Sequence, residues 1–320
     1  MATPPDQQNK STHSYEDDPR NAQVLVDVRG ELLPRPEAKV SVLDAGFVLG
    51  DGIWEGLRLH GGRVAFLDRH LDRLFAGARA IHMDLEGHGI TRASLTERLA
   101  RVLAANDMWD GVHVRLMVTR GLKTTPYQSP AATVGGPTVV ILPEWKTATP
   151  DVYTRGMKLF TVHVRRGRPD VQDPLLNTHS KHNCIQACIQ AAEAGADEAL
   201  MLDPHGFVAT CNSTHFFIVR RGELWTSSGK YCLDGITRGV MLELGRELGL
   251  VVREHDFSLA EVYAAEEAFV TGTFAGAVSV GSVDGRALPG PFPAPVTARL
   301  QAAYQERAHA EPLFPGLEKP

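Results

Sequence analysis

One lysine stands in a short polar segment that could support covalent chemistry. Residues 177–185 read NTHSKHNCI, and Lys181 is the only lysine between Lys158 and Lys230, so it does not belong to a charged lysine face. The segment directly precedes an expected helix. The partial positive charge of a helix N-terminus disfavours an ammonium group and favours the neutral amine that forms a Schiff base. Lys181 is therefore a candidate nucleophile, with an ordinary exposed lysine as the alternative.

Two stretches further along the chain contain residue types that bind phosphate. Residues 234–238 (DGITR) stand where a helix is expected to begin, and their small side chains let backbone N–H groups face an anion. Residues 271–273 (TGT) follow an expected strand and place two hydroxyls beside a glycine. Taken singly, each stretch also fits an ordinary helix cap or turn. Combined with Lys181, they favour a Schiff-base site with an anion cradle.

A metal site in the same region is a weaker interpretation. His179, His182, Cys184 and Cys188 are close in sequence, but zinc fingers use paired clusters of ligands on separate elements. Cys184 and Cys188 are four residues apart in an apolar helical pattern, which predicts thiols in the core. We therefore expect no metal.

The elements that must position these residues follow from the periodicity of the apolar side chains. Helical spacing predicts helices over 67–81, 92–105, 185–194, 235–248 and 295–308. Runs typical of strands cover 22–28, 38–42, 112–119 and 137–142, with several short strands in the second half. The loop over 120–136 is long for a compact domain, and such loops are often functional.

The length of 320 residues predicts about two domains. Residues 1–20 have few apolar side chains and are expected to form a flexible tail. A small N-terminal domain would cover 21–143, and a proline-containing interdomain linker would cover 144–152. A larger domain, rich in short strands, would cover 153–320.

Composition excludes several classes of protein. The 33 basic and 38 acidic residues give a formal charge of −5, which provides no basic stripe for nucleic acid or anionic lipid. Four cysteines are too few for a disulfide scaffold. There is no apolar run of about 18–20 residues to span a bilayer, and the polar N-terminus does not resemble a secretory signal. These features predict a cytoplasmic protein with no nucleic-acid or membrane partner.

Six motifs stand out along the chain, at residues 42–58, 70–74, 195–200, 235–238, 271–273 and 283–286. In sequence and in order they resemble those of the class IV aminotransferases, the fold-type IV enzymes that use pyridoxal 5′-phosphate (PLP). This family includes branched-chain and D-amino-acid aminotransferases, R-selective amine transaminases and aminodeoxychorismate lyase. The resemblance runs from about Val24 to about Arg286. It implies an α+β two-domain fold-type IV enzyme, with a small N-terminal α/β domain and a larger C-terminal pseudo-barrel domain.

The resemblance also implies residue roles. Lys181 would form the internal aldimine and move protons between the substrate Cα and C4′ of the cofactor. The phosphate would be bound by an arginine together with the two anion-binding stretches, and the loop over 120–136 would close over the substrate pocket. The phosphate ligands would be Arg73, Ile236, Thr237 and Thr273, and the pocket would include Trp54, Arg115, Phe274 and Ala275.

Two residues near the expected pyridine ring depart from the family pattern. Thr210 stands where the family usually has the glutamate that pairs with the pyridine nitrogen, and His215 replaces the usual asparagine. A hydroxyl has no charge to hold a proton on the ring, so we expect Thr210 to donate to an unprotonated nitrogen. The alternative is that Thr210 only packs and a neighbour such as His215 serves the nitrogen.

The resemblance predicts a homodimeric transaminase with its active site near the dimer interface. It would move an amino group between an amino acid or primary amine and a 2-oxo acid. Thr210 leaves open a PLP-dependent lyase or eliminase similar to aminodeoxychorismate lyase. A non-catalytic PLP-binding protein is a third alternative, which the intact lysine and phosphate residues disfavour.

Overall fold

The computed structural model of the chain describes residues 17–317, and contacts divide it into two units. The N-terminal unit contains Asp17–Thr147, Leu176–Ser180 and the chain from Ala308. The C-terminal unit contains Ala148–Leu175 and Lys181–Arg307. Two segments that the sequence boundaries place in the second domain therefore belong to the first. Most of the expected tail lies outside the described residues, although Asp18 already caps a 3-10 helix, Pro19–Gln23.

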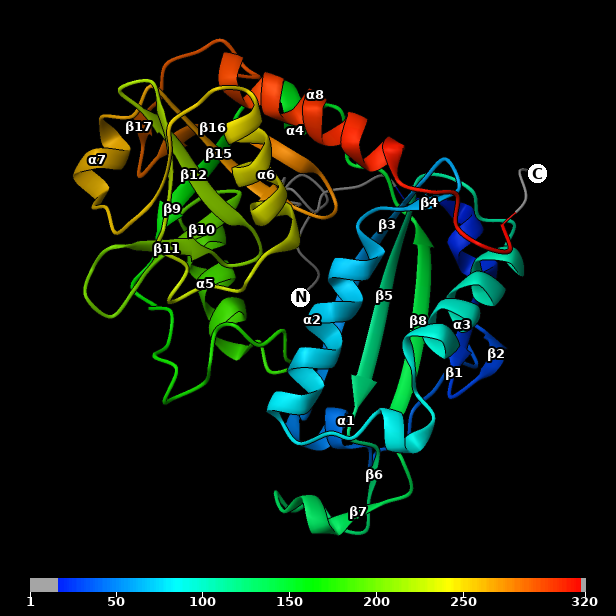
Figure 1. Ribbon diagram of the computed structural model, residues 1–320. Helices are drawn as coiled ribbons and strands as arrows, with labels where there is room; N and C mark the ends of the chain where they lie inside the picture. The colour runs from blue at the N-terminus through cyan, green and yellow to red at the C-terminus, as the bar shows by residue number, and fades with distance from the viewer. Residues whose placement is uncertain (1–16, 318–320) are drawn as a thin grey trace. The chain divides into compact units, whose positions relative to one another are not determined.

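The N-terminal unit is built on an antiparallel sheet of six strands in the order β2-β1-β8-β5-β3-β4 (Figure 1). A separate two-stranded sheet joins β6 to β7. The strands are β1 (Leu25–Val28), β2 (Glu31–Pro34), β3 (Gly52–His60), β4 (Arg63–Val64), β5 (Val112–Thr119), β6 (Leu122–Lys123), β7 (Thr133–Val134) and β8 (Thr138–Trp145). The helices are α1 (Ala45–Leu49), α2 (Leu67–Ala80) and α3 (Arg92–Ala104), with 3-10 turns at Glu86–His88 and Pro130–Ala132.

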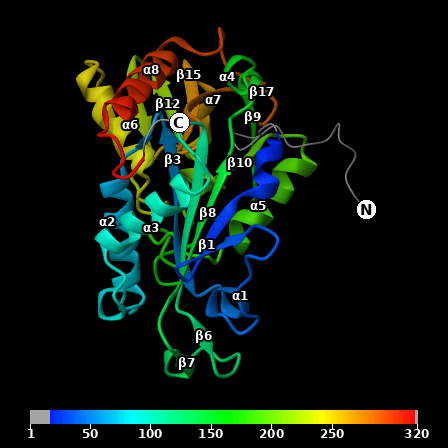
Figure 2. The same ribbon diagram turned by 90° about the vertical axis from the view of Figure 1, so that its right-hand side faces the viewer.

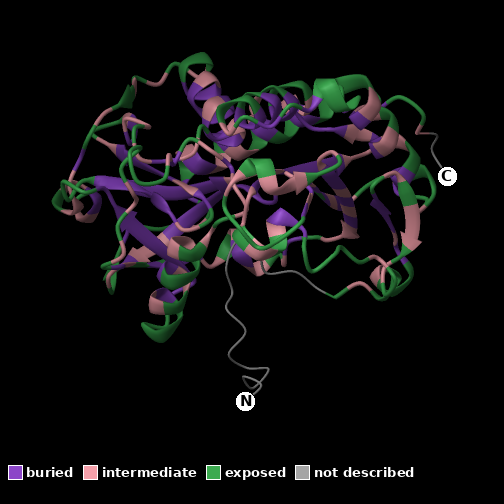
Figure 3. Cartoon of the chain, turned by 90° about the horizontal axis from the view of Figure 1, so that it is seen from below, coloured by how far each residue is buried: buried purple, intermediate pink, exposed green. Residues whose placement is uncertain are grey.

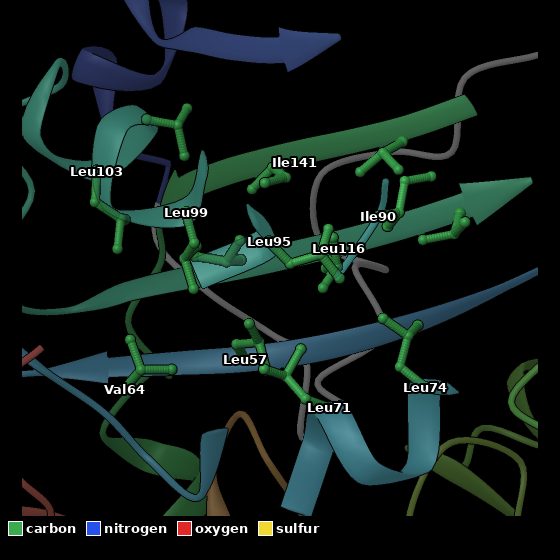
Figure 4. Close-up of a cluster of buried hydrophobic side chains, with 14 of the residues drawn as sticks. Leu57, Val64, Leu71, Leu74, Ile90, Leu95, Leu99, Leu103, Leu116 and Ile141 are labelled. Carbon is green, nitrogen blue, oxygen red and sulfur yellow. The ribbon is translucent and has the colours of Figure 1, made fainter. Parts of the chain in front are cut away.

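Helices α2 and α3 cover one face of this six-stranded sheet and bury its core. Figure 4 shows the leucines of both helices meeting Leu57, Leu116 and Ile141 of the three central strands. Burying one leucine stabilises a fold by about 1.5–3 kcal/mol, so this layer is the main source of stability in the unit. Both helices begin and end within a residue of their predicted limits.

The structure differs from the predicted strands in the part of the chain that precedes β3. Residues 38–42 form no strand, and the predicted first strand is shorter and is paired with β2 through the turn at Arg29 and Gly30. The glycine-rich stretch that follows contains α1, which Asp44 caps by accepting from the Gly46 N–H. In the predicted loop over 120–136, β6 pairs with β7, and the buried Lys123 donates to the Ser129 carbonyl at 2.9 Å.

The C-terminal unit is built on a nine-stranded sheet that curls into a half-barrel. Figure 2 shows helix α5 beside β9 and β10 of this sheet. Its order is β11-β10-β9-β16-β15-β12-β13-β14, with β17 paired to β16. The strands are β9 (Met157–Thr161), β10 (Glu198–Leu202), β11 (Val208–Cys211), β12 (His215–Arg220), β13 (Glu223–Thr226), β14 (Val252–Glu254), β15 (Glu267–Gly272), β16 (Gly276–Val283) and β17 (Arg286–Ala287). The helices are α4 (Asp151–Thr154), α5 (His182–Glu193), α6 (Ile236–Glu247), α7 (Leu259–Tyr263) and α8 (Pro295–Ala310).

Helix α5 packs on β9 and β10 through alanines rather than through its cysteines. Ala187 and Ala191 are fully buried against the sheet, whereas Cys184 and Cys188 are only half-buried. The prediction that both cysteines are core thiols is therefore wrong, because small residues let the helix approach the strands closely. Figure 3 shows that burial is concentrated in the strands, while the outer helix faces are exposed.

Candidate functional site

Lys181 lies at the start of α5, as predicted. It occupies the N-cap position, where its carbonyl accepts from the Ile185 N–H at 3.0 Å, and its side chain is half-buried. The contact division also places it at the point where the chain enters the C-terminal unit, directly after Ser180. The position of this lysine is therefore set by the residues on both sides of it.

The residues before Lys181 are bound to β3 within the N-terminal unit. The Trp54 N–H donates to the Asn177 carbonyl at 3.0 Å, and the Asn177 side chain donates back to the Trp54 carbonyl at 2.5 Å. The Trp54 indole N–H donates to the Thr178 carbonyl at 3.1 Å. His179 extends this pairing, with its N–H donating to the Gly52 carbonyl at 2.9 Å. Trp54, expected from the sequence only in a substrate pocket, thus also holds the segment that leads into Lys181.

The start of α6 has the features of a phosphate site. Gly235 is the N-cap, and no described side chain caps the helix, so its first N–H groups are available to an anion. Thr237 is buried in the first turn. On the neighbouring strand β15, the Thr271 hydroxyl is buried without a hydrogen-bond partner among residues 17–317. An uncapped helix start and an orphaned hydroxyl fit an oxyanion, and the residues present therefore suit a phosphorylated cofactor.

The His215 side chain packs against Gly235 and the loop that leads into α6. Its Nε2 donates to the Leu233 carbonyl at 2.7 Å, and it pairs with Thr271 across β12 and β15. A Cβ added at Gly235 would lie 2.3 Å from the imidazole Cε1, so only glycine fits there. The placement of His215 near the pyridine ring stays a prediction from the sequence, whereas in the structure its imidazole lies against the loop before α6.

Thr210 is buried on β11 and uses its hydroxyl hydrogen within a turn. Its Oγ1 donates to the Thr214 carbonyl at 2.8 Å, which leaves the oxygen lone pairs rather than the hydrogen for a ligand. The expected donation from Thr210 to a ring nitrogen would require this bond to break. The structure thus presents Thr210 as an acceptor.

Glu198, which sequence reasoning missed, anchors the same turn. It is fully buried on β10, and its Oε1 accepts from the Ser213 N–H at 3.1 Å, the Ser213 hydroxyl at 2.6 Å and the Thr214 hydroxyl at 2.9 Å. Burial raises the pKa of Glu198, and the hydrogen bonds from Ser213 and Thr214 oppose that shift. No short sequence signal distinguishes it, because its partners lie some fifteen residues away.

In the N-terminal unit, Arg73 is held by a buried carboxylate. Its Nε and Nη2 donate to Glu55 at 2.8 and 2.6 Å, so two of its three nitrogens form a fork on one acid. His70 Nδ1 lies 2.7 Å from the same carboxylate. Burial alone would raise the pKa of Glu55, but the hydrogen bonds from Arg73 and His70 outweigh it and lower the pKa. Glu55 therefore orients Arg73.

The expected pocket residues fall into two groups. On the N-terminal sheet, the Arg115 guanidinium stacks 4.1 Å from the centroid of the Trp54 ring. In the C-terminal unit, Phe274 and Ala275 are buried in its hydrophobic core, and Thr273 before them is half-buried. No cluster of three metal-ligating side chains occurs within residues 17–317.

Comparison with known proteins identifies the family. The profile of the amino-transferase class IV family matches residues 52–283. The chain belongs to the class IV aminotransferase family. It is 39% identical over 290 residues to the branched-chain-amino-acid aminotransferase-like protein 2 of Arabidopsis thaliana, covering 90% of this chain and 51% of that protein. The chain thus spans about half the length of this relative.

Two further similarities cover nearly whole proteins. A putative branched-chain-amino-acid aminotransferase of Methanocaldococcus jannaschii is 34% identical over 282 residues, covering 87% of this chain and 94% of that protein. The branched-chain aminotransferase of Thermoproteus uzoniensis, solved with norvaline, has a TM-score of 0.80 at 27% identity, and the match covers 91% of this chain and 97% of that chain. These matches confirm the expected α+β fold-type IV architecture of this class IV aminotransferase, and PLP is the cofactor of its family.

Substituting Gly235 tests the packing of His215 against the candidate phosphate site at the start of α6. In Gly235→Ala, the new methyl group must displace the His215 ring or the start of α6. We expect PLP affinity to fall by roughly 10- to 100-fold, as for loss of a charge-assisted hydrogen bond. Titration of the apoprotein with PLP, followed by absorbance, measures this change.

The matched control is Gly239→Ala, four residues along the same helix, where an added Cβ meets nothing within 4 Å. This variant should gain about 0.5–1 kcal/mol of stability from helix propensity and should keep its PLP affinity. Equal affinities in the two variants would show that His215 does not constrain the helix start.

The hydrogen bonds that the buried Glu55 carboxylate accepts from Arg73 and His70 predict that the free energy of unfolding depends on pH. Because the folded-state pKa of Glu55 lies below its ordinary value of 4.5, its charge stabilises the fold above that pH, and the stabilisation is lost as the pH falls through the folded-state pKa. Glu55→Gln should therefore cost about 3 kcal/mol of unfolding free energy at pH 7. The difference from the wild type should shrink below pH 4.5 in denaturant titrations.

Glu31→Gln serves as the control, because Glu31 is exposed on β2 of the same unit. Its small effect on the free energy of unfolding should not shrink below pH 4.5 as that of Glu55→Gln does. A Glu55→Gln deficit that stays constant down to about pH 3 would contradict the lowered pKa.

Proposed function

We propose that this chain is a PLP-dependent transaminase in which the Lys181 Nζ bonds the cofactor covalently. The observation that carries the proposal is the pairing of residues 177–179 with Gly52, Ile53 and Trp54, which fixes the chain up to the residue before Lys181. A nucleophilic amine needs such a fixed position at the start of a helix. The donor would be an amino acid or primary amine, and the acceptor a 2-oxo acid.

We further propose the residues that bind the phosphate. The N–H groups of Ile236 and Thr237 and the hydroxyls of Thr237 and Thr273 supply hydrogen bonds, and Arg73, oriented by Glu55, supplies a positive charge. When bound, PLP supplies an electron-withdrawing ring that stabilises negative charge at the substrate Cα. Lys181 then moves the proton to and from that carbon. The proposed pocket residues remain Trp54, Arg115, Phe274 and Ala275.

Thr210 supports a second candidate, a lyase or eliminase. Its hydroxyl carries no charge and is engaged with Thr214, so it cannot hold a proton on the ring as a carboxylate would. A ring with weaker electron withdrawal stabilises negative charge at the substrate Cα less, which favours a lyase or eliminase reaction over transamination. The products formed from the amino donor distinguish the two candidates.

A homodimer is proposed from an apolar surface on the N-terminal unit. Four side chains between residues 42 and 49 are exposed, and the most exposed are Val42 at 71% and Phe47 at 70%. An exposed apolar patch usually marks an interaction site, and its proposed occupant is a second copy of this chain. At the end of this stretch, Gly50 packs on Ser180, which places the patch close to the chain entering Lys181. The exposed residues are Val42, Leu43, Phe47 and Leu49.

Within the described residues, no helix combines the length and hydropathy needed to cross a membrane. The cytoplasmic location remains a prediction from the sequence.

Replacement of Lys181 tests the covalent assignment. Borohydride reduction of the holoenzyme should leave one phosphopyridoxyl group on the peptide that contains Lys181, detected by mass spectrometry. Lys181→Ala should lose that mass and several orders of magnitude of turnover. Lys158→Ala, an exposed lysine on β9, should behave as the wild type.

Undiminished turnover in Lys181→Ala would overturn the assignment. Consumption of the donor without amination of an acceptor would support the lyase, and binding without any turnover would support a non-catalytic protein.

Phe47→Asp tests the dimer. Placing a charge in the centre of an apolar interface costs several kcal/mol, so this variant should elute as a monomer at micromolar concentration. Light scattering after size-exclusion chromatography measures the mass. Leu313→Asp, at a side chain of the same unit that is 55% exposed and lies outside the patch, should stay dimeric.

A further inference from the structure

The segment 227–235, which joins β13 to α6, is held by basic side chains from outside the segment. Three of its backbone carbonyls accept hydrogen bonds from such side chains. The bonds run from Arg238 to Ser227 at 2.8 Å, from Arg166 to Tyr231 at 3.2 Å and from His215 to Leu233 at 2.7 Å. Because the segment ends at Gly235, the N-cap of α6, these bonds determine where the helix starts.

The Arg238 side chain joins the first turn of α6 to the ends of two strands. Arg238 is the third residue of α6, and only 7% of its side chain is exposed. The parallel register places Thr226 of β13 opposite Glu254 of β14, so the Ser227 carbonyl and the Glu254 carboxylate lie at the same end of the two strands. Arg238 Nη2 donates to both, at 2.8 Å to Ser227 and at 2.9 Å to Glu254 Oε2.

The two acceptors of Arg238 are themselves held in place. The Ser227 hydroxyl donates to the Ala209 carbonyl of β11 at 2.6 Å. Glu254 also accepts from Arg246 at 3.3 Å, eight residues further along α6. A hydrogen bond to a fixed acceptor restricts the donor, so Arg238 restricts the rotation of the first turn of α6.

Stability does not explain this buried arginine. Its Nε is buried and has no hydrogen-bond partner within residues 17–317. An unsatisfied buried N–H costs free energy, and an apolar side chain of similar volume would avoid that cost. The arginine therefore serves the arrangement of the helix start rather than the stability of the unit.

We propose that Arg238 is a positioning residue for the cofactor phosphate, because it fixes the direction in which the first turn of α6 presents its N–H groups. Thr237, beside it, is buried in that turn, and the orphaned Thr271 hydroxyl lies on the neighbouring strand β15. Hydrogen bonds weaken steeply as they bend, so a helix start that can rotate binds an oxyanion less tightly. The inference rests on the proposed function, since it concerns the phosphate site proposed there.

Comparison of PLP with pyridoxal, which lacks the phosphate, tests this role. The measured quantity is the Kd of the apoprotein for pyridoxal divided by its Kd for PLP, from absorbance titrations. Arg238→Met should lower this ratio by roughly tenfold or more with little change in the Kd for pyridoxal. Arg238→Lys, which keeps a charged donor, should recover most of the loss. A general weakening of the fold would affect both ligands and leave the ratio unchanged.

Arg246→Met is the matched control, because Arg246 lies on the same helix and binds the same carboxylate. Its ratio should equal that of the wild type. Glu254→Gln weakens the contact with Arg238 without removing the buried arginine, so it should lower the ratio about threefold. This variant decides the question where Arg238→Met does not fold.

Inorganic phosphate gives a readout that needs neither Lys181 nor turnover. A ligand that binds only the folded state stabilises it, so phosphate should raise the Tm of the wild-type apoprotein above its value in chloride at equal ionic strength. The rise should be smaller in Arg238→Met and unchanged in Arg246→Met.

An unchanged ratio in Arg238→Met, or in Glu254→Gln where the first variant does not fold, would overturn the inference and leave the proposed phosphate site in place. An undiminished rise in Tm with phosphate in Arg238→Met would do the same. A wild-type apoprotein that binds PLP no more tightly than pyridoxal would overturn the proposed phosphate site, and the inference with it.

Discussion

The pairing of residues 177–179 with β3 is the constraint on which the rest of the candidate site depends. Trp54 and Asn177 exchange backbone and side-chain hydrogen bonds although they lie 123 residues apart in sequence. This contact assigns a short segment of the second half of the chain to the N-terminal unit, and Lys181 follows it immediately. In the proposed function, Lys181 would be a nucleophile at the end of a fixed segment, and it would lose less entropy when it reacts.

Two buried carboxylates organise other residues of the candidate site in the same manner. Glu55 orients Arg73 from behind, and Glu198 holds the turn that directs the Thr210 hydroxyl. Their pKa values move in opposite directions, because Glu55 has cationic partners whereas Glu198 has only neutral donors. Neither acid has to contact a ligand for this effect. Glu55 sets the orientation of the Arg73 guanidinium, and Glu198 holds the turn that sets the direction of the Thr210 hydroxyl.

Sequence periodicity predicted the helices well and the short strands less well. Helices α2 and α3 match their predicted limits because each buries a continuous apolar stripe. The strand expected over 38–42 does not form, since an apolar run there has no partner strand and its side chains are exposed. The cysteines of α5 were misplaced for a related reason. Periodicity finds an apolar face, but packing of the small alanines decides which part of that face is buried.

The sequence by itself determined the family and the lysine at the start of a helix, and it predicted two phosphate-binding stretches, because these features depend on neighbouring residues and short motifs. Only the tertiary structure decided the direction of the Thr210 hydroxyl, the packing of His215 behind Gly235 and the meeting of Arg58 with Lys146. Strand register and long-range packing set these contacts. The partners of the last pair are 88 residues apart, and no local pattern brings them together.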